Sequence, residues 1–432
     1  MYGEVVFFLT SRPRIAQRGI DATPWARAPM RGAIGFLRTR PCGKFEWPVQ
    51  RVQEIRVPFD YPVVFTRGAL DETNGVLADA ISRREPARRH RALFVIDDGL
   101  VAATPGIARA IERYAKAHDT RLELAGEPLV VPGGERAKNE PAHLERVLAR
   151  IDHDRLDRHA FVVAIGGGAA LDMVGYAAAI AHRGVRVVRM PSTVLAQADS
   201  GVGVKCGVNA FGKKNFLGAF APPFAVVCDS GFLETLSPRD RRAGMSEAVK
   251  VALVKDGAMF EWIREIAPRL ASGEHELVTQ LVRKSADKHL DHIASGGDPF
   301  EMGSARPLDF GHWAAHKLES LTKNALRHGE AVAIGLALDA IISERMKMCD
   351  ARVPEETSAT LRALGFRLWH DALDRPDDVL AGLEEFREHL GGELTVTMLT
   401  RAGEGREVHQ VDPADVRAAI ARLRGENEEG AR

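Results

Sequence analysis

Short apolar, β-branched runs alternate with helix-like segments between residues 90 and 230, and this alternation is the strongest constraint on the fold. The strand-like runs are residues 92–96, 129–131, 161–165, 185–190 and 225–227. Residues 105–118 and 141–151 carry apolar residues at helical spacing. Strands that alternate with helices predict a mainly parallel sheet covered by helices. Ligands bind beyond the carboxyl ends of strands in such sheets, where Gly166 to Gly168 would lie.

The pattern changes after Ser237. Helix-like segments follow at residues 238–255, 257–270, 274–295, 312–322, 329–348 and 354–364, and a strand-like run comes only at residues 394–399. We therefore expect an α/β, Rossmann-like nucleotide-binding domain over residues 50–236. An all-α, or at least mainly helical, metal- and substrate-binding domain would follow over residues 237–424, with the active site in the interdomain cleft.

Composition excludes several classes of partner. Lys and Arg number 59, as do Asp and Glu, so no global field favours nucleic acid or a membrane surface. No apolar run approaches the roughly 20 residues that span a bilayer. The four cysteines are scattered, which favours a reducing cytoplasm over a disulfide framework. Residues 1–46 are rich in arginine without a sustained period, and we expect a disordered extension or a start codon assigned too early rather than a transit peptide.

Three glycine-rich segments are candidates for contact with a ligand. Gly166-Gly167-Gly168 with Asp172 follows a strand and would aim helix N–H groups at a pyrophosphate, although a tight strand-to-helix turn explains it equally well. Residues 133–138 are a second such turn or a surface loop. Residues 199–209 hold three glycines, which predicts a loop built for close approach to a ligand.

Glu247, His312 and His328 are a carboxylate and two imidazoles, a set that binds zinc with one coordination position left open. Each also has a simpler explanation. Glu247 and Lys250 at i and i+3 could form an ordinary ion pair on a helix face. His316, at i+4 from His312, could share the metal or donate a hydrogen bond nearby. His328 could cap the helix that it begins.

The order of these motifs resembles the dehydroquinate synthase-like sugar phosphate cyclases, and within them most closely the EboD-type subgroup. The resemblance covers residues 52 to 399. Its motifs are G-G-E-x-x-K (133–138), G-G-G-x-x-x-D (166–172), H-R-G (182–184), P-S-T (191–193), D-S-G-V-G-x-K (199–205), K-N-x-L-G (214–218), E-A-V-K (247–250), F-G-H (310–312) and H-G-E (328–330).

The resemblance implies roles for particular residues. Zinc, or cobalt, would be held by Glu247, His312 and His328. NAD would lie against Glu135, Lys138, Gly167, Gly168, Asp172, Thr193, Lys214 and Thr235. Catalytic groups would be Asp199, Lys205, Lys250, Asp309 and His316. The substrate would be bound by Arg183, Asn215, Lys288, Arg306 and Arg387, with Arg183 lent across the interface of a homodimer.

The implied reaction is a transient oxidation, β-elimination of phosphate, re-reduction and aldol closure of a sugar phosphate. Its substrate would be 3-deoxy-arabino-heptulosonate 7-phosphate and its product 3-dehydroquinate. Asp309 stands where the dehydroquinate branch has asparagine, and Asp309 with the Gly207-Val208-Asn209 turn looks more like cyclases that use sedoheptulose 7-phosphate, which stays an alternative. A late Asp-Lys-Lys of the dehydroquinate branch is also missing, with Arg387 near its place, whereas His316 resembles that branch. A carboxylate at Asp309 adds a charge that should disfavour a substrate carboxylate. A metal-dependent NAD polyol dehydrogenase and a non-catalytic nucleotide binder remain further alternatives.

Overall fold

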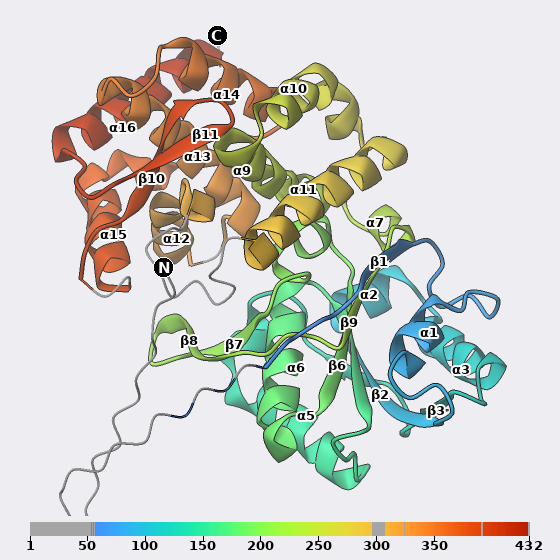
Figure 1. Cartoon of the computed structure of the whole chain (residues 1–432). Helices are drawn as coiled ribbons and strands as arrows, with labels where there is room; N and C mark the ends of the chain where they lie inside the picture. The colour runs from blue at the N-terminus through green and yellow to red at the C-terminus, as the bar shows by residue number, and fades with distance from the viewer. Residues whose placement is uncertain are drawn as a thin grey trace, which may run out of the picture. The chain divides into compact units, whose positions relative to one another are not determined.

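Alternate residues of the central strands face opposite sides of a parallel sheet, as the period of two in a strand requires. In β2 (His90–Asp97), Phe94 and Ile96 pack against α1 and α3, whereas Leu93 and Val95 pack on the opposite face with α5 and α6. Both faces are therefore buried, and the strands carry nearly continuous apolar runs. Figure 1 shows α5 and α6 on one side of the sheet and α1 and α3 on the other.

The computed structural model describes residues 57–295, 307–323, 325–389 and 392–430, with Gln53 and Ile55. Pro58–Arg432 form one compact unit, which we describe as a sheet region (residues 58–236) and a helical region (residues 237–430). The proposed extension at residues 1–46 and the predicted substrate residue Arg306 lie outside the described residues. The domain boundary at residue 237 remains a prediction.

The main sheet runs in the order β1-β9-β6-β5-β2-β3, with β4 also on β2, and every pairing in it is parallel. Its strands are β1 (Val63–Thr66), β2, β3 (Leu122–Leu124), β4 (Leu129–Val131), β5 (Phe161–Gly166), β6 (Arg186–Pro191) and β9 (Ala225–Asp229). Its helices are α1 (Val76–Ser82), α2 (Asp98–Ala103), α3 (Ile107–Ala117), α4 (Arg136–Asn139), α5 (Pro141–His153), α6 (Gly168–Ile180) and α7 (Gly231–Glu234).

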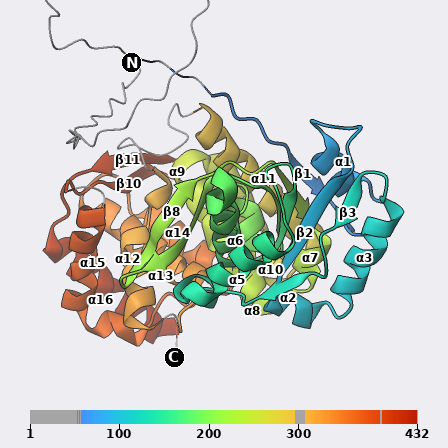
Figure 2. The same cartoon turned by 90° about the horizontal axis from the view of Figure 1, so that it is seen from below.

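An antiparallel hairpin, β7 (Lys205–Ala210) and β8 (Lys213–Phe220), replaces part of the loop expected over residues 199–209. The prediction was wrong there because glycine was interpreted as a strand breaker. Gly207 instead lets the two strands approach: a Cβ on it would lie 2.7 Å from the carbonyl oxygen of Leu217. The preceding turn is a π-helix, Ala196–Ser200. The hairpin packs on α6 and runs toward α12 (Figures 1 and 2).

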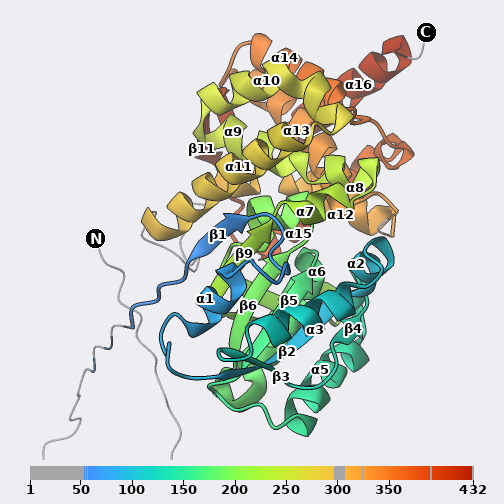
Figure 3. The same ribbon diagram turned by 90° about the vertical axis from the view of Figure 1, so that its right-hand side faces the viewer.

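The helical region contains α8 (Pro238–Ala243), α9 (Met245–Lys255), α10 (Gly257–Ser272), α11 (His275–Ser295), α12 (His312–Leu321), α13 (His328–Arg345), α14 (Arg352–Ala363), α15 (Pro376–His389) and α16 (Pro413–Gly430). It also holds the hairpin β10 (Val396–Arg401) and β11 (Glu404–Val408), whose first strand the run at residues 394–399 predicts. The prediction of a parallel α/β region followed by a helical one is confirmed, with this hairpin as the departure from an all-α region (Figure 3).

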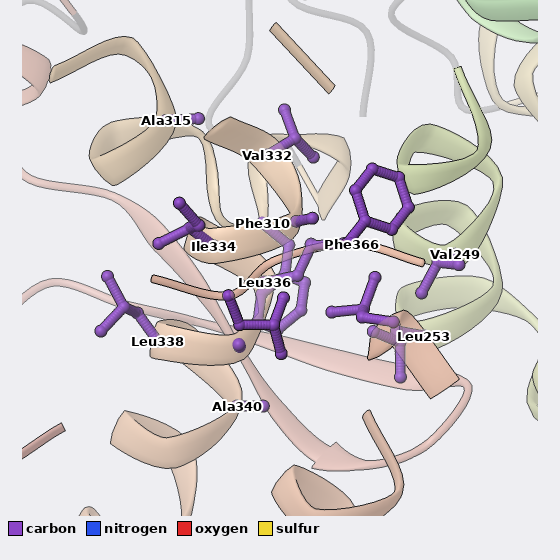
Figure 4. Close-up of a cluster of buried hydrophobic side chains, with 14 of the residues drawn as sticks. Val249, Leu253, Phe310, Ala315, Val332, Ile334, Leu336, Leu338, Ala340 and Phe366 are labelled. Atoms are coloured by element: carbon purple, nitrogen blue, oxygen red, sulfur yellow. The ribbon is translucent and has the colours of Figure 1, made fainter. Parts of the chain in front are cut away.

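Helix α13 is buried on all sides and forms the centre of the helical region, as expected of a helix that is apolar all round. Figure 4 shows Val332, Ile334, Leu336 and Leu338 of this helix in the apolar cluster that α9 and Phe310 also enter. The metal-ligand candidates His312 and His328 begin α12 and α13, which pack on each other. Among the described residues, no helix is both long and apolar enough to cross a membrane.

Candidate functional site

A cavity of about 1120 Å³ lies where the carboxyl ends of β2, β5 and β6 face the helical region. Its wall includes all eight residues assigned to the nucleotide by resemblance: Glu135, Lys138, Gly167, Gly168, Asp172, Thr193, Lys214 and Thr235. The same wall carries Asn215, His316 and His328. Nucleotide and metal candidates thus meet in one cleft between the sheet and helical regions.

The glycine-rich turn is held open by a buried carboxylate. Asp97 Oδ2 accepts a hydrogen bond from the Gly167 amide at 2.7 Å, while its Oδ1 accepts one from Leu100 at 2.7 Å and caps α2. A Cβ on Gly168 would lie 2.5 Å from Ser200 Oγ, so a side chain there would crowd the wall. The turn therefore leaves the start of α6 exposed to a ligand, which is the geometry that favours phosphate binding.

The hairpin closes one side of this cavity through Lys138 and Asn215. Lys138 Nζ donates to Asp172 Oδ2 at 2.8 Å and also bonds Asn215 Oδ1. Asn209 Nδ2 donates to Glu135 Oε1 at 2.6 Å. These contacts join α4, α6 and the hairpin, and they connect two of the predicted nucleotide residues, Lys138 and Asp172, directly.

Glu247, His312 and His328 converge on one point next to the cavity. His328 Nε2 lies 3.2 Å from Glu247 Oε1, and His312 Nε2 lies 3.5 Å from the same oxygen. The ligand atoms of the three side chains all lie within 4.8 Å of one another. Glu247 is completely buried, and a buried carboxylate faced by two imidazoles is a set that a divalent cation would satisfy.

The other ring nitrogen of each histidine has its own partner. His312 Nδ1 lies 3.1 Å from the carbonyl oxygen of Phe310, and His328 Nδ1 lies 3.2 Å from Glu319 Oε2. Metal-binding histidines characteristically donate their second N–H to a carbonyl or carboxylate, which turns the remaining lone pair to the metal. The alternative that His328 caps α13 is not supported, because the capping contact is made by Glu330 to the Arg327 amide at 3.0 Å.

Two glycines fix the histidine-bearing helix starts. Gly311, just before His312, has φ +78°, and a Cβ on it would lie 2.8 Å from the Leu336 amide nitrogen of α13. Gly329, just after His328, packs so closely on α8 that a Cβ would lie 1.6 Å from the Ala243 carbonyl oxygen. Glycine at both positions allows backbone contact that sets where the two imidazoles point.

Lys250 forms an ion pair with Glu247, one of the metal-ligand candidates. Its ammonium lies 2.5 Å from Glu247 Oε2, and this pair is buried rather than the exposed ion pair considered from sequence. Burial lowers the pKa of Lys250, but Glu247, Asp199 and Asp309 outweigh it and raise that pKa above the ordinary value. The ammonium therefore stays charged, and Asp309 is one of the carboxylates that stabilise this charge.

Asp199 lies beside His289, 3.0 Å from its Nδ1. Burial raises the pKa of Asp199, but His289 and Lys250 lower it to about 2. Burial likewise lowers the pKa of His328, yet the hydrogen bonds that it donates to Glu247 and Glu319 raise it to about 10. Two carboxylates thus favour a positive charge at His328, and a metal ion would supply that charge in place of a proton.

The side chain of His316 is exposed to the cavity. Desolvation by the walls of the cleft, together with His312 and His328, lowers its pKa well below the ordinary value and favours the neutral imidazole. Its ring centroid lies 5.5 Å from that of His312. A neutral ring can accept or donate a hydrogen bond to a bound substrate.

Three predicted substrate residues lie away from this cluster within the chain. Arg183, with φ +63°, is exposed beside Arg155 and Arg158 in a separate pocket. Lys288 forms an ion pair with Asp256 at 2.8 Å, and Arg387 one with Glu384. Asp309 is half-buried in a short 3-10 helix, Pro307–Asp309, and Lys205 begins β7.

Sequence reasoning missed Glu319, His289 and Arg189. Glu319 lies seven residues after His312 and three after His316, so the helical spacing could have placed it on their face. His289 directly follows Lys288, and nothing in the sequence marks it. Arg189 is 1% exposed and donates to the carbonyl oxygens of Gly203 at 2.9 Å and Lys205 at 2.8 Å, so it positions the start of β7.

Comparison with known proteins gives consistent matches. Residues 128–243 match the family model described as 3-dehydroquinate synthase N-terminal, and residues 244–385 match 3-dehydroquinate synthase C-terminal. A 3-dehydroquinate synthase of Cereibacter sphaeroides is 36% identical over 350 residues, which cover 79% of this chain and 91% of that protein.

Two solved structures share the fold. The 2-epi-5-epi-valiolone synthase of Streptomyces hygroscopicus, with NAD+ and Zn2+ bound, superposes with a TM-score of 0.77 at 29% identity, covering 88% of this chain and 100% of that one. A 2-deoxy-scyllo-inosose synthase complexed with carbaglucose-6-phosphate, NAD+ and Co2+ gives a TM-score of 0.68 at 21% identity, over 83% and 96% of the two chains.

Proposed function

Because this chain belongs to the 3-dehydroquinate synthase family, we propose that it closes a seven-carbon sugar phosphate into a carbocycle with release of phosphate. The first candidate substrate is 3-deoxy-arabino-heptulosonate 7-phosphate, with 3-dehydroquinate as product. The observation that carries the proposal is the convergence of His312 Nε2 and His328 Nε2 on Glu247 beside the cavity. The enzyme is a lyase, since its redox cofactor ends the reaction unchanged.

The residues present fit both zinc and NAD. Glu247, His312 and His328 would hold the metal, Zn2+ or Co2+, with a position left open. The turn at Gly167 and Gly168 would hold NAD together with the other six predicted nucleotide residues, Glu135, Lys138, Asp172, Thr193, Lys214 and Thr235. Bound together, these groups supply a reversible hydride acceptor and a Lewis acid for a substrate oxygen.

The side chains of the chain supply binding and proton transfer. Lys250 keeps its ammonium charged and, with Lys205, would bind phosphate oxygens as point charges. Asp199 stays ionised beside His289 and can accept a hydrogen bond from a substrate hydroxyl. Neutral His316 at the cavity wall can exchange a proton with the substrate.

We further propose a homodimer in which Arg183 of a second subunit completes the phosphate site. Its exposed position in a separate pocket supports this, because Arg183 does not line the cavity of its own chain. Lys288 and Asn215 are proposed to contact the same substrate. Scattered cysteines support a reducing cytoplasm as the compartment.

Sedoheptulose 7-phosphate is the second candidate substrate, favoured by Asp309. The carboxylate of Asp309 acts on Lys250 together with Glu247 and Asp199, so this side of the pocket is acidic. Arg387, predicted to bind the substrate, is paired with Glu384 instead. A substrate that carries a hydroxyl in place of a carboxylate suits these charges better.

Incubation with each seven-carbon phosphate in parallel tests the proposal. Protein loaded with zinc and NAD should release inorganic phosphate from one of them at a rate that chelation abolishes, and the carbocycle should be identified by mass spectrometry. Net NADH formation from a simple polyol, without phosphate release from either sugar phosphate, would instead identify a polyol dehydrogenase.

A further inference from the structure

Glu319 is a buried carboxylate whose two oxygens are committed to partners from different regions. It lies on α12 and is 4% exposed. Its Oε2 lies 3.2 Å from His328 Nδ1, and its Oε1 lies 2.9 Å from Lys214 Nζ. His328 belongs to the metal-ligand set, whereas Lys214 of β8 lines the nucleotide cavity. One side chain therefore touches both halves of the site.

The contact with His328 fixes which ring nitrogen carries the proton. A carboxylate only accepts hydrogen bonds, so the Nδ1 that faces Glu319 must carry the hydrogen. With a metal ion in place of the second proton, the lone pair of Nε2, the nitrogen that faces Glu247 at 3.2 Å, would point to the ion. Phe310 gives His312 the same tautomer through its carbonyl oxygen. Glu319 differs in bringing a negative charge, which makes the imidazole a stronger ligand.

A second candidate metal set, His316, Glu319 and His328, has ligand atoms equally close together. In that set Glu319 would itself bind the ion. Its Oε1, however, holds the Lys214 ammonium, and a cation bound there would have to displace or oppose that charge. Lys250 holds Glu247 Oε2 in a similar way, but two imidazole nitrogens point at Glu247 Oε1 and only one points at Glu319 Oε2. The geometry therefore favours Glu319 as a support for the metal site.

The contact with Lys214 positions a side chain of the nucleotide cavity. The lysine side chain is 37% exposed, so without a partner it would sample many rotamers. Glu319 restricts the ammonium to one side of the cavity wall. The ion pair also joins β8 of the sheet region to α12 of the helical region.

We propose that Glu319 is a positioning residue shared by the metal site and the nucleotide cavity: it presents His328 Nε2 to the ion and holds Lys214 in place for the nucleotide. This rests on the proposed use of zinc and NAD. It adds a residue outside the predicted ligand sets, and it couples the two sites through one carboxylate.

Equilibrium binding to Glu319→Gln tests this without turnover. Zinc affinity is measured by competition with a chromophoric chelator in the absence of NAD, and NAD affinity by calorimetry on zinc-saturated protein. We expect zinc affinity to fall about 10- to 100-fold, as for other carboxylates that support metal-bound histidines, and NAD affinity to fall as well. Glu319→Asp keeps the charge on a shorter side chain, so its zinc and NAD affinities should lie between those of the wild type and Glu319→Gln. This variant replaces Glu319→Gln in the test if the glutamine variant does not fold.

Glu385→Gln is the matched control. Glu385 also pairs with a lysine of α12, Lys317, at 2.5 Å, but it is exposed and remote from the metal-ligand set. It should leave both affinities unchanged. The visible spectrum of Co2+-loaded protein gives a second readout, since it should change in Glu319→Gln and not in Glu385→Gln.

Unchanged zinc affinity and an unchanged Co2+ spectrum in Glu319→Gln would overturn the proposed positioning of His328. Unchanged NAD affinity would overturn the proposed positioning of Lys214. Complete loss of zinc, equal to that in Glu247→Gln, would instead make Glu319 a ligand. These results are distinct from failure of the proposed function, in which the wild-type protein would bind zinc and NAD but release no phosphate.

Discussion

Glu247 Oε1 and His328 Nε2 lie 3.2 Å apart although 81 residues separate them in the chain. Helices α9 and α13 bring them together, and Gly329 of α13 packs on Ala243 at the end of α8, directly before α9. The contact is buried on the Glu247 side, so these two groups need a cation between them or a proton on the imidazole. The relationship makes His328 the most informative single position in the chain.

Replacing His328 by Ala should take zinc from one ion per chain to near zero, because two ligands do not complete a zinc site. Elemental analysis after gel filtration measures this. His275→Ala is the control, since His275 pairs with Glu234 away from the metal site. Full zinc content in His328→Ala would remove this residue from the ligand set.

Replacing Lys250 by Met should lower the free energy of unfolding by about 3 to 5 kcal/mol in zinc-free protein, because Glu247 would be left buried without its ammonium partner. Zinc should restore part of this loss by neutralising Glu247. Urea unfolding with and without zinc measures both effects. An unfolding free energy equal to that of the wild type would contradict the buried ion pair.

Asp339 should make stability depend on pH between about 4 and 7. Burial raises its pKa to about 7, although Trp313 and Gly311 donate to it at 2.8 and 2.7 Å. The folded state therefore holds a proton that the unfolded state has lost above pH 4, so stability is full at low pH and declines as pH rises toward 7. Between pH 5 and pH 7 the decline should be about 2 kcal/mol.

The Asp339 effect is isolated by comparison with Asp339→Asn in zinc-free protein. The difference in unfolding free energy between wild type and variant should shrink as pH rises through this window. Equal pH profiles for the two proteins would show that Asp339 is ionised throughout.

Replacing Asp309 by Asn should shift substrate preference toward the sugar phosphate that carries a carboxylate. The change removes a negative charge that acts on Lys250 and adds a donor. We expect the ratio of kcat/KM values for the two seven-carbon phosphates to move by about tenfold, or about 1.4 kcal/mol. A ratio that does not move would exclude Asp309 as a determinant of substrate choice.

Arg183 provides a test of the dimer. Arg183→Ala and Lys250→Met should each be inactive as homodimers, and mixed dimers of the two should recover activity, because one site would have both a wild-type Lys250 and a wild-type partner Arg183. Recovery is measured after co-expression and tandem affinity purification. No recovery in mixed dimers would place the function of Arg183 within its own chain.

The sequence predicts the sheet and most helices because their signals are local. The continuous apolar runs of β2 and β5, which are buried on both faces, and the helical spacing of α3 and α5 follow from residue type alone. Local patterns fail where a glycine serves packing between strands: Gly207 marks the β7–β8 pair and not a loop.

Motif order predicts the candidate site better than individual residues do. All eight nucleotide candidates line one cavity and the three metal candidates converge, while their roles stay predictions. Contacts such as Asp199 with His289 or Glu319 with Lys214 depend on how the sheet region packs on α11 and α12. No spacing along the chain encodes such contacts, so sequence reasoning could not find them.

Phosphate and NADH measured together in one reaction test the central claim most directly. Zinc- and NAD-loaded protein is mixed with each seven-carbon phosphate, and inorganic phosphate and NADH absorbance are followed over many turnovers. The account predicts phosphate release in large excess over enzyme from one substrate, with no net accumulation of NADH. NADH that rises in step with turnover, or zinc- and NAD-saturated protein that releases no phosphate from either substrate, would contradict it.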